Sequence, residues 1–154
     1  MSRTVRFALC AALALAAAPV FADGPFRFFP ITPCRLADSR PSNPIAAQTS
    51  RNYTVQGACG IPVNAKAVVL NATIVGAPTD GYVTLHPSNV ARPLAANLTF
   101  KAGEPALGNG AIVGLATTTP DLTAYVFLAS GSSHFVLDTT GYFCKVDGGG
   151  ACIP

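Results

Sequence analysis

Two histidines, His86 and His134, are the first residues to consider for acid–base chemistry. His134 and Asp138 would share one face of a strand predicted over 134–143. A strand rises about 3.3 Å per residue, so their side chains would lie roughly 13 Å apart, too far for a hydrogen bond. His86 falls on the outward face of another predicted strand and is interpreted as a solvated side chain. A general acid–base pair would therefore need a carboxylate from a neighbouring strand.

Nucleophiles and paired carboxylates are not indicated either. The segment 130–133 reads as a loop, without the helix that follows a G-x-S-x-G nucleophile elbow. Glu104 is the only glutamate, and Asp80 and Asp121 stand in turn-like sequence, so a glycosidase pair is not expected. No glycine cluster precedes a helical segment, as a phosphate-binding loop would require. The sequence therefore predicts a protein that is not an enzyme, with no catalytic residues and no cofactor.

Arg35, Asp38 and Arg40 form the densest group of charges in the chain. Their guanidinium groups suit an anion or a sugar hydroxyl as ligand. They also suit an internal ion-pair cluster, and the prolines around them favour this second interpretation because proline removes backbone donors. We interpret the three residues as a structural ion-pair cluster. Asp138 and Tyr142, predicted on one face of the last strand, could join it.

Residues 1–22 have the features of a signal peptide. Arg3 and Arg6 give a positive start, a continuous apolar run follows, and small residues precede a cleavage position at Ala22. The run is too short to span a bilayer. We expect cleavage between Ala22 and Asp23.

The mature chain over 23–154 is expected to be a single secreted domain, located outside the cell, on its surface or in the periplasm. Without the signal peptide, eight of the ten basic residues remain beside seven acidic ones. This balance argues against nucleic acid as a partner. No later apolar run has the length of a membrane span, so no integral membrane segment is expected after processing.

Four cysteines follow the predicted cleavage site: Cys34, Cys59, Cys144 and Cys152. An even number in an exported chain indicates disulfides. Four cysteines allow three pairings, and we favour Cys34–Cys59 with Cys144–Cys152 because each pair is sequential. The chain has neither a C-x-x-C motif nor clustered ligands, so a metal site is not expected.

From residue 23 onward the sequence predicts an all-β fold. No segment keeps a 3.6-residue period, and glycine and proline interrupt short runs rich in valine and threonine. The clearest strand is 68–75, whose even positions are all apolar. A turn at 78–81 and a strand at 82–86 follow, so these two strands are predicted to form a hairpin. Further strands are expected at 26–29, 53–56, 97–100, 111–116, 122–129 and 134–143. About eight strands at regular spacing indicate an antiparallel β-sandwich of jelly-roll type.

The outward positions of these strands carry the candidate ligand-binding residues. They are Asn71, Thr73, Tyr82, Thr84, His86, Asn97 and Thr99. Amides, hydroxyls and aromatic rings are the usual groups for binding sugar hydroxyls and for stacking on sugar rings. An antiparallel sheet normally shows a polar face to water, and the chain has no tryptophan, so an ordinary solvated surface stays open as an alternative.

Three motifs carry a resemblance to known proteins. They are Pro33-Cys34-Arg35-Leu36-Ala37-Asp38-Ser39-Arg40, Cys59-Gly60-Ile61-Pro62 and Asp138-Thr139-Thr140-Gly141-Tyr142-Phe143. In this order and spacing the chain resembles a β-domain family of exported bacterial proteins, found in actinobacteria and acidobacteria alone, in tandem or beside other extracellular modules. The resemblance covers nearly the whole mature chain, with Ser39 where the family pattern has threonine. It implies an exported domain with a Cys34–Cys59 pair, and it implies no activity.

Three functions stay open at this stage. The leading prediction is a secreted, non-catalytic binding or adhesion module, with a glycan or a cell-envelope polymer as partner. The alternative is a structural surface protein that self-associates, and the third is an extracellular hydrolase without a recognisable motif. A concave polar groove in the folded domain would favour the first of these over a flat solvated sheet.

Overall fold

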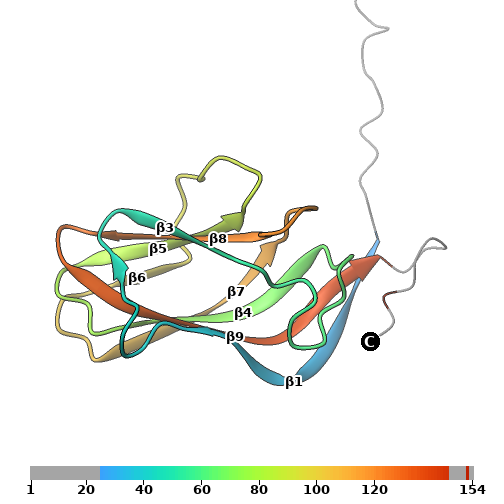
Figure 1. The fold of residues 1–154 in the computed structure, drawn as a ribbon, viewed down its shortest axis with the longest axis horizontal. Coiled ribbons are helices and arrows are strands. Elements are labelled where there is room, and N and C mark those ends of the chain that lie inside the picture. The colour runs from blue at the N-terminus through green and yellow to red at the C-terminus, as the bar shows by residue number, and fades with distance from the viewer. Residues whose placement is uncertain (1–24, 146–151, 153–154) are drawn as a thin grey trace, which may run out of the picture.

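The computed structural model describes residues 25–145 and Cys152, so the predicted signal peptide and its cleavage site at Ala22 and Asp23 lie outside the described residues. The described residues form nine β-strands in two antiparallel sheets that pack face to face (Figure 1). The strands are β1 (Phe26–Asp38), β2 (Ile45–Ala46), β3 (Thr49–Tyr53), β4 (Ala67–Val75), β5 (Gly81–Pro87), β6 (Leu98–Phe100), β7 (Ala106–Gly114), β8 (Leu122–Leu128) and β9 (Ser132–Lys145). This part of the chain has no helix long and apolar enough to cross a membrane.

The strand order is that of a jelly roll. The first sheet runs β1-β9-β4-β7, with β2 also paired to β9, and the second runs β3-β8-β5-β6. Only Ala47 and Gln48 separate β2 from β3, and Gln48 has a positive φ of 56° where the chain passes between the sheets. Counted as one position, β2 and β3 give eight strand positions in the arrangement of two Greek keys. The predicted all-β antiparallel sandwich of jelly-roll type is confirmed.

The predicted hairpin between 68–75 and 82–86 is wrong. β4 pairs with β7 and β9 in the first sheet, whereas β5 pairs with β6 and β8 in the second. The alternation in β4 is nevertheless as predicted, because Val68, Leu70 and Ile74 are buried in one core with Val83 of β5. The chain changes sheets between the two strands, so their apolar faces pack against each other across the core.

β9 contains a bulge that changes which of its side chains face the core. Between Thr139 and Gly141 its register with β4 shifts by one residue. Asp138 therefore faces outward, whereas Tyr142 is buried and stacks on the ring of Phe29 with centroids 5.4 Å apart. The prediction that Asp138 and Tyr142 share one face is wrong, because an extra residue in a strand reverses the alternation beyond it.

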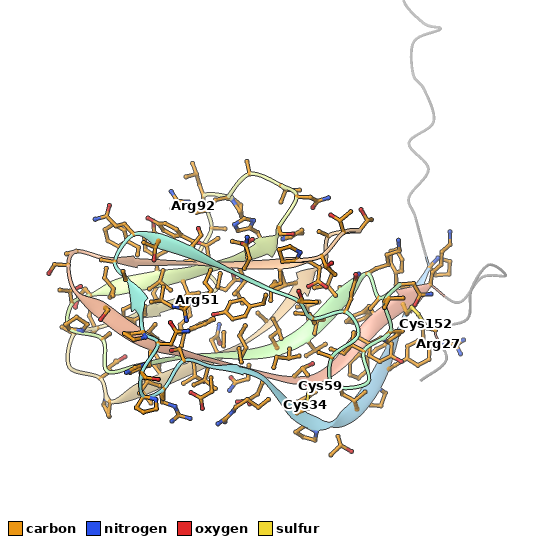
Figure 2. The ribbon with its side chains drawn as sticks, viewed as in Figure 1. Arg27, Cys34, Arg51, Cys59, Arg92 and Cys152 are labelled. Carbon is orange, nitrogen blue, oxygen red and sulfur yellow. A yellow bond between two sulfur atoms is a disulfide. The ribbon has the colours of Figure 1, made fainter. Side chains whose placement is uncertain are left out.

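Both predicted disulfides are present. Cys34 of β1 is bonded to Cys59 in the segment before β4, and Cys144 of β9 is bonded to Cys152. Their Cα atoms are 5.9 Å and 6.0 Å apart, within the usual range for a disulfide. Figure 2 shows Cys34, Cys59 and Cys152 toward the same end of the sandwich. The sequential pairing is therefore confirmed.

Candidate ligand-binding site

The predicted ligand-binding residues are divided between the two sheets. Asn71 and Thr73 lie in β4 on the outer face of the first sheet, where Asn71 Nδ2 is 3.3 Å from Thr73 Oγ1. The other five belong to the second sheet or its margin: Tyr82, Thr84 and His86 in β5, Thr99 in β6 and Asn97 just before β6. The seven do not share one face, because that expectation depended on β4 and β5 being neighbours.

The outer face of β5 is covered by the segment 88–97, which joins β5 to β6. Thr84 and His86 are both buried beneath it, and His86 is only 7% exposed. His86 Nδ1 donates a hydrogen bond to Pro87 O at 2.9 Å. The interpretation of His86 as a solvated side chain is therefore wrong, because the side chain is buried and hydrogen-bonded to the backbone.

Polar side chains attach this segment to the sheet. Thr84 Oγ1 donates to Ala95 O at 2.7 Å, and Asn97 Oδ1 accepts a hydrogen bond from Leu85 N at 2.7 Å. At the other end of the segment, the Ser88 hydroxyl donates to a backbone carbonyl just before β8. The segment is held at both ends, so its central residues have a defined position above the sheet.

A pocket of about 260 Å³ lies between the strand face and this segment. Tyr82, Thr84 and Thr99 line its sheet side, and residues 92–96 line the other. Two more hollows of about 340 Å³ each adjoin it, and Thr99 lines all three. Asn97 lines the second hollow. Four of the seven predicted residues therefore lie on one hollowed surface.

An aromatic row lies beside the pocket on the outer face of the second sheet. The ring of Tyr82 stacks on Phe127 of β8 with centroids 5.0 Å apart, and Tyr125 of β8 lies 6.2 Å from Tyr82. The guanidinium of Arg92 sits over the Tyr125 ring, 3.7 Å from its centroid. Figure 2 shows Arg92 in the connecting segment on the side of the second sheet. This is a cation–π contact that holds the guanidinium beside the pocket.

Sequence reasoning missed Arg92, Tyr125 and Phe127. The signal for the two aromatic residues was present, because the even positions of 122–128 are apolar and buried while Thr123, Tyr125 and Phe127 alternate with them. No comparable pattern pointed to Arg92, which belongs to an irregular segment.

The functional groups that line the pocket are suited to binding rather than to acid–base chemistry. It offers an aromatic ring, hydroxyl groups and one guanidinium, and none of the described residues that line it is a carboxylate or a histidine. Within the described part of the chain, no three His, Cys, Asp or Glu side chains gather where they could hold a metal ion.

His134 lies elsewhere and is engaged with Ser39. His134 Nδ1 donates to Ser39 O at 3.0 Å, while Ser39 Oγ accepts a hydrogen bond from Phe135 N at 2.7 Å. Because Nδ1 already carries a proton for the carbonyl, it is not the base for the Ser39 hydroxyl 3.5 Å away. These contacts join the end of β1 to β9.

The charges of Arg35, Asp38 and Arg40 form a network at the surface of the first sheet. Asp38 accepts hydrogen bonds from Arg40 at 2.6 Å and from Arg35 at 3.0 Å, and Arg35 Nε donates to Asp138 at 2.9 Å. The hydrogen bonds from Arg40, with the charge of Arg35, hold the pKa of Asp38 well below its usual range. Half of the Arg35 side chain is exposed, so water screens these ion pairs. Asn71 is the direct neighbour of Asp138 across β4 and β9, and so borders this network rather than the pocket.

Replacing Asp38 by Asn should make unfolding less sensitive to acid. The pKa of Asp38 is lowered in the fold, so the stability due to its ionised form is complete above the ordinary value of 3.8 and is lost as pH falls toward the lowered value. We expect the urea midpoint of Asp38→Asn to lie below that of the wild type by a constant amount from pH 7 to pH 5. The difference should narrow steadily below about pH 4. A difference that stays constant down to pH 2 would show that the ion pairs contribute no pH-dependent stability.

Comparison with known proteins adds little to this description. No family model matches the chain, and no curated protein matches it. Two structures of tobacco streak virus coat protein, one of a C2 crystal form and one of a dimer, are similar to it at a TM-score of 0.37 and 12% identity. Each similarity covers 79% of this chain and 90% of the coat protein. A likeness at this level carries no argument about function.

Proposed function

We propose that this chain is an exported, non-catalytic binding module that holds a glycan or a cell-envelope polymer in the pocket between Tyr82 and the segment 88–97. The observation that carries the proposal is the Tyr82 ring, which lines the pocket and is fixed in orientation by stacking on Phe127 at 5.0 Å. The face of a sugar ring carries C–H groups that pack against an aromatic face, while its hydroxyl groups need polar partners. Thr99, an exposed hydroxyl in the same pocket, supplies such a partner.

The size and surroundings of the pocket support a polymer rather than an isolated small molecule. Its volume of about 260 Å³ is slightly below the range of roughly 300–1,000 Å³ that is typical of small-ligand sites. One sugar ring would occupy it, and the adjoining hollows that share Thr99 provide room for the next units of a chain. Two disulfides in so small a domain are typical of proteins that work outside the reducing cytosol.

Tyr82→Ala should weaken glycan binding by about 10- to 100-fold, which is the usual loss when a central aromatic contact is removed. Binding is measured by depletion of the mature protein on a panel of insoluble polysaccharides and by calorimetry on the soluble form of those retained. Phe26→Ala is the matched control, because it removes an exposed aromatic ring from β1 in the other sheet. Both variants must unfold in urea with a midpoint close to that of the wild type, so that a loss of binding is not a loss of folding.

Equal binding by the wild type and Tyr82→Ala would place the ligand elsewhere. Absence of wild-type binding across neutral, acidic and amino-sugar polymers would reject the proposal itself.

A self-associating surface protein is the second candidate, and one observation favours it. Phe28 and Ile112 are large apolar side chains on the outer face of the first sheet, with Ile112 65% exposed. The two strands between them, β9 and β4, carry Gly141 and Val69 at this level of the sheet. The Phe28 ring packs over Gly141. Sedimentation velocity of the mature chain separates the candidates, because a monomer at high concentration would reject self-association through this surface.

A further inference from the structure

We infer that the sugar held in the pocket is an acidic one, and that Arg92 binds its carboxylate. The inference rests on the proposed function and specifies the class of glycan. It follows from the charge of the pocket, from the way Arg92 is held and from the shape of a guanidinium.

Arg92 is the single charged residue among those that line the pocket. The other side chains on its side of the pocket, at 93–96, are proline, leucine and alanine. Two carboxylates, Asp80 and Glu104, line the third hollow. There Asp80 is paired with Lys101 at 2.7 Å. The pocket therefore has a net positive charge, carried by a guanidinium that is exposed to solvent and reachable by an anion.

Arg92 is held in place without being neutralised. Its guanidinium lies 3.7 Å from the centroid of the Tyr125 ring, and the ion pairs of the described residues involve Arg35, Arg40 and Lys101 instead. The contact with the ring uses none of the N–H groups as a hydrogen-bond donor, and among the described residues Arg92 makes no ion pair. These donors are therefore available to an acceptor in the pocket.

The geometry of those donors favours a carboxylate. A guanidinium presents its N–H groups as a planar fork that matches the two oxygens of a carboxylate with two parallel hydrogen bonds. Tyr82 and Arg92 line the same pocket, so one sugar can pack its ring on Tyr82 while its carboxylate reaches Arg92. Uronic acids have this combination of a ring and a planar anion. Tyr125 is then a positioning residue that acts through Arg92.

The test compares each acidic polymer with an uncharged form of the same polymer. Polygalacturonate, alginate and hyaluronate are presented to the wild-type mature chain beside their methyl-esterified or carboxyl-reduced forms. We expect at least one of the acidic forms to bind about tenfold or more tightly than its uncharged partner, as for a hydrogen bond to a charged group. Arg92→Gln should abolish that preference, so that the variant binds the acidic and uncharged forms with affinities within about threefold of each other.

Arg27→Gln is the matched control, since it removes the same charge from β1, and Figure 2 shows Arg27 near Cys152, away from Arg92. It should keep the preference. Tyr125→Leu should reduce the preference without the loss of neutral binding expected for Tyr82→Ala, because it releases the guanidinium and leaves Tyr82 in place. Arg92→Lys should retain part of the preference for the acidic form, because an ammonium has the charge but not the planar fork of donors.

Three results would overturn the inference. They are equal binding of acidic and uncharged forms, equal losses in Arg92→Gln and Arg27→Gln, or a preference for sulfated over carboxylated polymers. If neutral polymers bind through Tyr82 without any preference for acid, the proposed function stands and the inference alone fails.

Discussion

Asp121→Ala should lower the free energy of unfolding by about 3 to 5 kcal/mol, because it removes two hydrogen bonds from a buried carboxylate. The Asp121 side chain has no exposed surface. Its Oδ1 accepts a hydrogen bond from Val55 N at 2.9 Å, and its Oδ2 accepts one from Gln56 N at 2.8 Å. Without the carboxylate, two backbone donors would stay buried with no acceptor.

The backbone of Asp121 also joins neighbouring segments. Asp121 N donates to Tyr53 O at 3.1 Å, and its carbonyl accepts from Ala116 N at 2.9 Å. Asp121 therefore holds together the segment after β3 and the segments on either side of the turn before β8. The Ala variant keeps these backbone hydrogen bonds, so its loss comes from the two side-chain hydrogen bonds to Val55 N and Gln56 N. Because both donors are buried, the destabilisation should still exceed that of an ordinary surface change.

The measurement is urea unfolding of the wild type, Asp121→Ala and Asp121→Asn. The Asn variant keeps the shape and one acceptor oxygen, so its unfolding free energy should fall between the other two. Asp80→Ala is the control, because Asp80 is also an aspartate in turn-like sequence but lies at the surface paired with Lys101. A loss of less than about 1 kcal/mol in Asp121→Ala would show that water satisfies the two N–H groups.

Sequence patterns predicted the architecture well because they report local burial. Alternating apolar positions in 68–75 and 122–128 correspond to buried faces of β4 and β8, and regular turns divide the chain into the strands of a jelly roll. The cysteine pairs followed from their order in the chain. Each of these signals concerns residues that are close in sequence or that face one common core.

The errors concern which elements become neighbours. The turn between β4 and β5 has the sequence of a hairpin, but the chain changes sheets there. The bulge in β9 reversed the face of Tyr142, and its signal in the sequence is Gly141, an isolated glycine inside a strand. Local sequence indicates only a turn at Asp121. Its carboxylate oxygens accept hydrogen bonds from Val55 N and Gln56 N, which are distant in sequence. Long-range pairing is not encoded in local alternation.

The candidate site could be predicted only in part for the same reason. Tyr82 and Thr99 were selected as outward residues of strands, and both line the pocket. The pocket itself exists because the segment 88–97 lies over β5, and no periodic pattern in that segment indicates where it folds. Thr84, chosen as a ligand contact, donates to Ala95 O and so also holds the wall of the pocket in place.

Loss of the Cys34–Cys59 bond should destabilise the fold more than loss of Cys144–Cys152. A disulfide stabilises mainly by restricting the unfolded chain, and the effect grows with the length of chain that it closes. The two bonds join residues 25 and 8 positions apart. Loop-closure entropy then gives about 3.5 kcal/mol for the first and about 2.5 kcal/mol for the second.

The comparison uses double variants, Cys34→Ala with Cys59→Ala and Cys144→Ala with Cys152→Ala, so that no unpaired thiol can exchange. Alanine is preferred to serine because Cys144 and Cys152 are buried, where a hydroxyl would need a partner. The first bond also fixes β1, an edge strand that pairs only with β9, to the segment before β4. Unfolding free energies from urea titration should rank the wild type above the tail variant and the tail variant above the Cys34 variant. The reverse ranking would contradict the loop-length argument. It would mean that these bonds contribute mainly through the folded state, where Cys152 anchors β9.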